Sequence, residues 1–257
     1  MSTTVLLFGF IAGATIVLGL PIARLRHPAP ALRILLNATA VGVLIFLIWD
    51  VLSHAWDPID AALTARPFPS SLWLNGALLV GGLVVGLVGV TLFETRWMRG
   101  SAATEIPPRR LALLIAVGIG LHNFAEGLAI GQSAASGELA LAGVLVVGFA
   151  LHNATEGFGI VAPLAGEPER PSWGFLLLLG AIGGGPTLLG SIVGSLVVSE
   201  QLSVLFLSLA AGSILYVVIT LLGMLGRARR TGLVATGILV GLIAGFATDA
   251  ILTAGGA

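Results

Sequence analysis

The sequence predicts an all-α integral membrane protein with eight transmembrane helices and a single transmembrane domain over residues 1–257. Of the 257 residues, 57% are hydrophobic and only 9% are charged, and the mean hydropathy is +1.07. A soluble protein of this composition could not cover its surface with polar groups. The apolar runs are long and continuous, whereas a membrane β-strand would alternate over about ten residues.

The charge and the cysteine content exclude several classes of function. All 12 basic residues are arginine, and 12 acidic residues balance them, so the chain lacks the surplus of positive charge that binding to nucleic acid requires. It contains no cysteine, which excludes disulfide frameworks, thiolate metal sites and thiol nucleophiles. We therefore expect the lipid bilayer as a partner and no nucleic acid.

Eight windows of about 20 mainly apolar residues are long enough to cross the hydrocarbon core of a bilayer. In chain order, they cover residues 3–21, 34–54, 72–93, 110–133, 138–164, 173–197, 202–223 and 231–252. The first window is not a cleaved signal peptide, because Arg24 and Arg26 follow the apolar stretch instead of preceding it. Eight helices leave little of the chain outside the membrane.

Three spans carry further polar or helix-breaking residues. Asp50 and His54 are one turn apart near the end of the second span, where they fit either a metal-binding station at the outer mouth or an ordinary hydrated helix end with interfacial tryptophans. Asp249, near the end of the eighth span, is open to the same two interpretations. In the sixth span, the glycines at 183–185 precede Pro186 and should weaken the helix, although close helix packing is the simpler explanation.

Arginines are concentrated in alternate loops. Eleven of the twelve follow the first, third, fifth or seventh span, and Arg66 alone lies in a loop after an even-numbered span. Cytoplasmic loops are the ones that retain arginine, so these four loops should face the cytoplasm. Both termini should then lie outside the cytoplasm in a multi-pass protein of the cell membrane.

An internal repeat lies on the fourth and fifth spans. Residues 118–127 and 148–157 share the pattern Gly-x-x-Leu-His-Asn-x-x-Glu-Gly, displaced by 30 residues. Each copy places a histidine and a carboxylate near mid-span, where ionisable groups are costly and mark functional sites. At 100° per residue, the histidine, asparagine and glutamate of one copy share a helix face. Gly137 is midway between His122 and His152, in the predicted turn, so both histidines should lie at the same depth.

Six polar side chains can therefore converge between these two helices: His122, Asn123, Glu126, His152, Asn153 and Glu156. Imidazole nitrogen and carboxylate oxygen suit zinc, iron, manganese and similar ions, and two ionised glutamates would offset the charge of a dication. We interpret the repeat as a site for a divalent metal ion, with no prosthetic group and no enzymatic activity.

Two alternatives stay open. The repeat could be a structural polar network, because hydrogen bonds between helices stabilise membrane proteins. It could also belong to an intramembrane metal-dependent hydrolase, which needs an open water position and a general base. The sequence contains neither His-Glu-x-x-His nor Gly-x-Ser-x-Gly, the motifs typical of such enzymes.

The paired His-Asn-x-x-Glu-Gly motifs, within eight spans whose ends both lie outside, resemble the ZIP family (Zrt- and Irt-like proteins) of divalent metal transporters. The resemblance implies uptake of zinc, or of iron, manganese, cobalt or cadmium, into the cytoplasm, a 3+2+3 arrangement of helices and often a homodimer. In the family, the histidine and glutamate of both motifs bind metal midway along the pathway. The glutamates can bridge two metals, and the asparagine belongs to the second metal position. These roles carry over to the six residues named above.

Three features depart from the family pattern. Ala125 and Thr155 stand where proline commonly precedes the motif glutamate, so these helices should be straighter. Gly185 precedes Pro186 where many members have the glutamate that completes the second metal position, so we expect one tightly held metal. The loop between the third and fourth spans is short and has no histidine, so it offers no metal-sensing segment.

Overall fold

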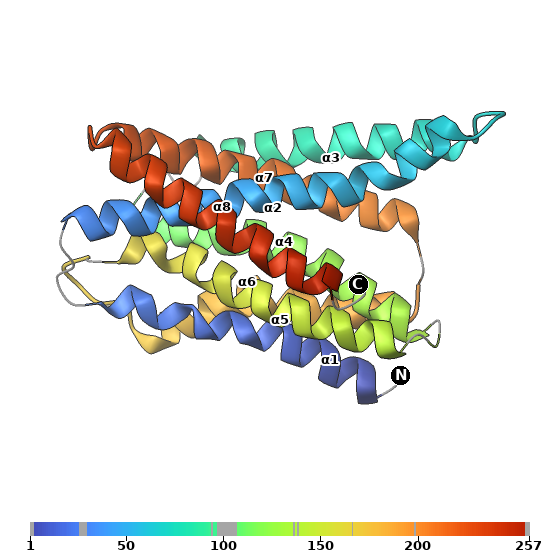
Figure 1. Ribbon diagram of the computed structural model, residues 1–257, viewed down its shortest axis with the longest axis horizontal. Coiled ribbons are helices and arrows are strands. Elements are labelled where there is room, and N and C mark those ends of the chain that lie inside the picture. Colours follow the sequence, from blue (N-terminus) through green and yellow to red (C-terminus); the bar gives the residue numbers. More distant parts are fainter. Residues whose placement is uncertain are drawn as a thin grey trace.

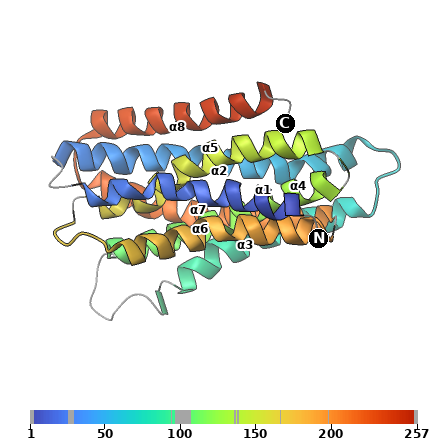
Figure 2. The same cartoon turned by 90° about the horizontal axis from the view of Figure 1, so that it is seen from below.

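The fold comes from a computed structural model that describes residues 3–25, 30–93, 95–96, 107–135, 137, 139–165, 167–197 and 199–254. All regular elements within these ranges are helical, as predicted. They are α1 (Thr3–Ala14), η1 (Thr15–Leu18), η2 (Leu20–Arg24), α2 (Pro30–Thr64), α3 (Ser71–Phe93), α4 (Pro108–Ala135), α5 (Leu139–Val161), η4 (Ala162–Leu164), α6 (Trp173–Gly194), α7 (Glu200–Gly226) and α8 (Thr231–Ala254). The long helices form an elongated bundle, and both chain ends lie at the same end of it (Figure 1, Figure 2).

Seven helices of the described part are long and apolar enough to cross a membrane. The largest difference from the predicted windows is in α2, which continues past residue 54 through Pro58 to Thr64. An apolar window detects only the part of a helix that matches the hydrocarbon core, so the polar final turns were missed. Asp50 and His54 consequently lie well inside α2. The window 138–164 corresponds to α5, which is not among the seven, so the count of eight spans stays a prediction.

The helices pack as two groups of four. In one group, α4 lies along α6, and α1 packs against α5 and α6. In the other, α2 pairs with α8 and α3 with α7, while α2 also packs on α7. Contacts of α4 with α7, and of α5 with α2 and α8, join the two groups. A large cluster of buried apolar residues drawn from both groups fills the centre of the bundle.

The outer faces of α3 and α8 carry large apolar side chains that are exposed: Val80, Val84, Val85, Val88, Leu92, Leu239, Val240, Ile243, Phe246 and Ile251. Soluble monomers rarely expose apolar patches of this extent. Contact with lipid removes the unfavourable exposure to water, so these faces fit the membrane environment that the composition predicts.

Arginine-bearing segments meet at one end of the bundle. The Arg24 guanidinium lies 5.0 Å from the ring centroid of Trp173, and Arg33 Nη2 lies 3.5 Å from Glu167 Oε1. The end of η2 and the start of α2 therefore lie beside the segment between η4 and α6. The turn between α7 and α8 lies at the same end (Figure 1). The connection between α2 and α3, which contains Arg66, lies at the opposite end (Figure 1). Two of the eleven loop arginines, Arg26 and Arg99, lie outside the described residues.

Candidate functional site

The two copies of the repeat lie on α4 and α5. Gly137, in the short connection between them, has a φ of 84°, a left-handed conformation that glycine adopts without strain. His122 Nε2 lies 3.3 Å from Glu126 Oε1 on its own helix and 3.9 Å from Glu156 Oε1 on α5. The structure thus brings the histidine of the first copy together with the glutamates of both.

These polar groups are buried at the centre of long apolar helices. His122 is 3% exposed, Glu126 6% and Glu156 0%. Charged groups removed from water are costly unless opposite charges compensate them. Two carboxylates here share one described imidazole, so an ionised pair keeps an excess of negative charge even when His122 is protonated. The arrangement favours a cation.

The two asparagines are anchored to neighbouring helices in the same way. Asn123 Nδ2 donates to the carbonyl oxygen of Gly183 on α6 at 3.0 Å, and Asn153 Nδ2 donates to that of Ala12 on α1 at 2.9 Å. Both side chains are fully buried. Each amide oxygen has no hydrogen-bond partner among the described residues. Each asparagine therefore holds a buried oxygen acceptor ready for a cation or a water molecule.

The glycine that closes each motif lets a further helix approach. A Cβ atom at Gly127 would collide with the carbonyl oxygen of Thr187 on α6, and one at Gly157 would collide with that of Ile16 in η1. The first copy thus packs on α6 in the way that the second packs on η1. The repeat of the sequence is therefore also a repeat of packing, and glycine closes each motif because the neighbouring backbone leaves no room for a side chain.

His152, the remaining predicted ligand, belongs to α5, but its side chain lies outside the described residues. Among the side chains that are described, no group of three His, Cys, Asp or Glu residues is arranged to hold a metal ion. The 3.3 Å separation of His122 Nε2 and Glu126 Oε1 nevertheless matches the spacing of about 3.3 Å between ligands of a tetrahedral ion with bonds of about 2.0 Å.

Asp50 and His54 form a separate polar pair. His54 Nδ1 lies 3.6 Å from Asp50 Oδ1, and the His54 side chain is 64% exposed. The Asp50 side chain is 17% exposed, so the pair is more open to its surroundings than the buried repeat. Asp249 is half-buried on α8. The structure does not bring these three residues into the site on α4 and α5.

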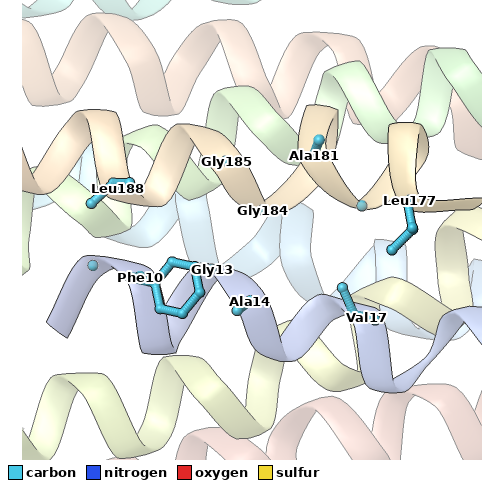
Figure 3. A pocket seen from close by; sticks show the side chains of 11 residues that line it. Phe10, Gly13, Ala14, Val17, Leu177, Ala181, Gly184, Gly185 and Leu188 are labelled. Atoms are coloured by element: carbon cyan, nitrogen blue, oxygen red, sulfur yellow. The ribbon is translucent and has the colours of Figure 1, made fainter. Parts of the chain in front are cut away.

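The glycine before Pro186 does not face the site. Gly185 is exposed, and a Cβ atom there would meet nothing within 4 Å. It lines an apolar groove between α1 and α6, together with Phe10, Gly13, Ala14, Val17, Leu177, Ala181, Gly184 and Leu188 (Figure 3). By contrast, Gly184 lies in close contact with Gly13 of α1, so close packing explains this part of the triple glycine. An acid at position 185 would point out of the bundle.

Residues of α6 that do approach the repeat are Gly183 and Thr187. Gly183 anchors Asn123, and Thr187 is fully buried against the glycine that follows Glu126. Thr187 is not recognisable from the sequence alone, because a single threonine in an apolar span has no distinguishing pattern. Its spacing of four residues from Gly183, which places both on one helix face, is the signal that was present.

A family model for ZIP zinc transporters matches residues 98–251, which is more than half of the chain. The matched segment includes both copies of the repeat and α6. No curated protein matches the chain.

Proposed function

The chain belongs to the ZIP zinc transporter family, and from this premise we propose that it carries divalent metal ions through a site between α4 and α5. Family members are transporters of divalent metal, and the apolar helices make this chain a membrane protein. One observation carries the proposed site: the His122 imidazole meets the buried carboxylates of Glu126 and Glu156, which come from two helices.

The proposed ligands are His122, Glu126, His152 and Glu156, and Asn123 and Asn153 supply neutral oxygens beside them. Two carboxylates balance one dication. A second dication would bring four positive charges against two carboxylates, and their repulsion is poorly screened in a low dielectric. One tightly held ion is therefore the expected state. The ion is cargo, and no prosthetic group is needed.

Zinc is the proposed substrate, with iron, manganese, cobalt and cadmium as further candidates. Imidazole nitrogen and carboxylate oxygen accept all of these ions, and affinity order alone does not select among them. The transport direction that we propose is uptake into the cytoplasm, and both termini should lie on the side of the cell membrane opposite the cytoplasm. The meeting of arginine-bearing segments at one end of the bundle supports this orientation.

The 3+2+3 arrangement is likewise a proposal, and helix pairing supports it. In a 3+2+3 arrangement, α1, α2 and α3 correspond to α6, α7 and α8. The contact of α2 with α8 then corresponds to the contact of α7 with α3, and both pairs pack closely in the second group. The anchoring of Asn123 to α6 and of Asn153 to α1 follows the same exchange. A homodimer is proposed on family grounds.

The other two interpretations explain less. A structural network could be built from serine, threonine or asparagine without placing carboxylates at mid-depth. The hydrolase interpretation gains no support from the family match, since family members are transporters.

Metal uptake into proteoliposomes tests the proposal. Purified protein is reconstituted, and uptake of zinc, iron, manganese, cobalt and cadmium is compared with that of a variant carrying Glu126→Ala and Glu156→Ala. We expect uptake by the variant to fall to near background, because both charged ligands are lost, while its circular dichroism and elution volume are retained.

Glu167→Ala is the matched control, because Glu167 is a loop carboxylate whose ion pair with Arg33 is partly exposed and worth little. Undiminished uptake by the double variant would refute the site. A hydrolase would instead yield a chemically altered product in a metal-dependent manner.

A further inference from the structure

The hydroxyl group of Thr187 on α6 is a buried oxygen beside the proposed metal site. We propose that Thr187 Oγ1 contacts the transported cation and increases the affinity of the site for oxygen-preferring ions, manganese above all, relative to zinc. This inference rests on the proposed function and adds a third helix to the site.

Thr187 lies at the level of both anchored asparagines. It is one helical turn after Gly183, whose carbonyl oxygen holds Asn123, and a turn rises about 5.4 Å. A Cβ atom on Gly13 of α1 would lie 3.2 Å from Thr187 Cβ. Gly13 directly follows Ala12, whose carbonyl oxygen holds Asn153. The threonine is thus positioned between the two anchoring points.

On the other side, Thr187 lies against α4. Its backbone carbonyl oxygen faces Gly127, the residue that directly follows Glu126. The side chain is 0% exposed, so it faces the interior of the bundle and not lipid. The positions on α1 and α4 that contact Thr187 are therefore neighbours of site residues on both sides.

The Thr187 hydroxyl lacks the hydrogen bond to the preceding helical turn that several other threonines of this protein make. Thr91, Thr220 and Thr236 each donate to the carbonyl oxygen four residues earlier, at 2.7, 3.0 and 2.9 Å, as helical threonines commonly do. For Thr187 that acceptor is the oxygen of Gly183, which receives Asn123 Nδ2. Thr187 Oγ1 has no hydrogen-bond partner in the described part of the chain. A fully buried hydroxyl in this state points to a ligand.

The internal repeat provides a comparison within the molecule. Ala12 anchors Asn153 as Gly183 anchors Asn123. Ile16 follows Ala12 by four residues, and Thr187 follows Gly183 by four residues. The backbone oxygens of Ile16 and Thr187 face the closing glycines of the two motifs in the same way. A fully buried isoleucine thus fills the corresponding place on the other side. Packing at the corresponding place therefore does not require a hydroxyl, which supports a contact between Thr187 and the cation.

The repeat and Thr187 thus offer three buried neutral oxygens that have no hydrogen-bond partner in the described part of the chain: Asn123 Oδ1, Asn153 Oδ1 and Thr187 Oγ1. Oxygen ligands suit manganese and other hard cations, whereas imidazole nitrogen suits zinc. An added hydroxyl oxygen should therefore contribute more to manganese binding than to zinc binding.

Calorimetric titration of the purified protein in detergent with manganese chloride and, separately, with zinc chloride tests this inference. Thr187→Val replaces the hydroxyl with a methyl group at nearly constant volume. We expect manganese affinity to fall about tenfold, the size of effect seen for residues that support metal sites, and zinc affinity to fall less. Thr187→Ser, which keeps the hydroxyl, should retain manganese affinity.

Ser191→Ala is the matched control. Ser191 lies one turn further along α6 and is equally buried, but its hydroxyl donates to the Thr187 carbonyl oxygen at 2.9 Å. Wild-type manganese affinity in Thr187→Val would overturn the inference, and so would an equal loss in Ser191→Ala, which would indicate packing alone. If the wild-type protein binds neither metal, the proposed function fails as well. If metal binding depends on Glu126 while manganese affinity does not depend on Thr187, the inference is overturned and the proposed function stands.

Discussion

At the scale of single residues, the site combines ionisable and neutral donors from several helices. Glu126 and Glu156 supply negative charge, and His122 lies within 3.9 Å of both. Asn123 and Asn153 use their amide nitrogens to bind neighbouring backbone, which leaves their oxygens pointing elsewhere. Charge and anchoring are thus divided between different residues, so the carboxylates need not hold the helices together.

The variant Gly185→Glu tests whether residue 185 faces the proposed metal site. Because a side chain there would point into the exposed groove between α1 and α6, Gly185→Glu should not strengthen a second metal position. It should instead destabilise the protein by about 2.5–3.5 kcal/mol, the cost of an acidic group facing lipid at mid-helix. Metal content per chain, measured by elemental analysis after purification in modest zinc, should remain one in both proteins.

Wild-type protein with two ions per chain at low zinc would contradict the charge argument. A variant that gains a second ion would instead show that position 185 reaches the site. The resemblance to the family suggests that an acid at this position would complete a second metal site, whereas the exposure of Gly185 on α6 argues against it.

At the scale of helices, glycine contacts set the distance between elements. α4 approaches α6 where Gly127 meets the Thr187 backbone, and α5 approaches η1 where Gly157 meets the Ile16 backbone. In lipid no hydrophobic force favours one apolar helix over its surroundings, so close backbone contact contributes much of the association. The same contacts hold the two copies of the repeat against the helices that anchor their asparagines.

Gly127→Ala tests this packing. The added methyl group would collide with the Thr187 carbonyl oxygen, so α4 and α6 must separate, and overpacking of this kind costs about 1–3 kcal/mol. Thermal unfolding in detergent should show a lower midpoint. Gly89→Ala on α3 is the matched control, because a Cβ atom there meets nothing within 4 Å. Equal unfolding temperatures for the two variants would disprove the role of Gly127.

At the scale of the whole molecule, charge and chain ends are arranged along the bundle axis. The Arg33 and Glu167 pair joins the first turn of α2 to the segment before α6 at one end, and both chain ends lie at the other (Figure 1, Figure 2). A chain that crosses the membrane an even number of times has both of its ends on the same side. The side of the membrane on which each end lies is set during insertion by the arginines.

Accessibility of tags checks the orientation. An epitope at either terminus should be labelled in intact cells, while one inserted near Ala102, a position outside the described residues, should be labelled only after permeabilisation. The expected pattern follows from retention of arginine-rich loops in the cytoplasm. The reverse pattern would invert the orientation and the proposed direction of transport.

Much of the fold follows from local properties of the chain. Hydrophobic length predicts the positions of the spans, because only a helix satisfies its own backbone in lipid, and seven candidate spans agree. α2 extends beyond the predicted apolar window at 34–54, because the helix continues past its apolar part. The repeat also indicated which residues could meet, because helical periodicity places His122, Asn123 and Glu126 on one face.

Tertiary structure alone decided what surrounds that repeat. The sequence by itself determined the membrane class, the order of the helices and the polar residues of α4 and α5, because these depend on composition and on spacing along the chain. Rotation of α6 about its axis depends on contacts with α1 and α4, which are far away in sequence. Those contacts turn Gly185 outward and bury Thr187 between the anchoring points of Asn123 and Asn153, so the packing of α6 against the repeat is recognisable only in the folded chain.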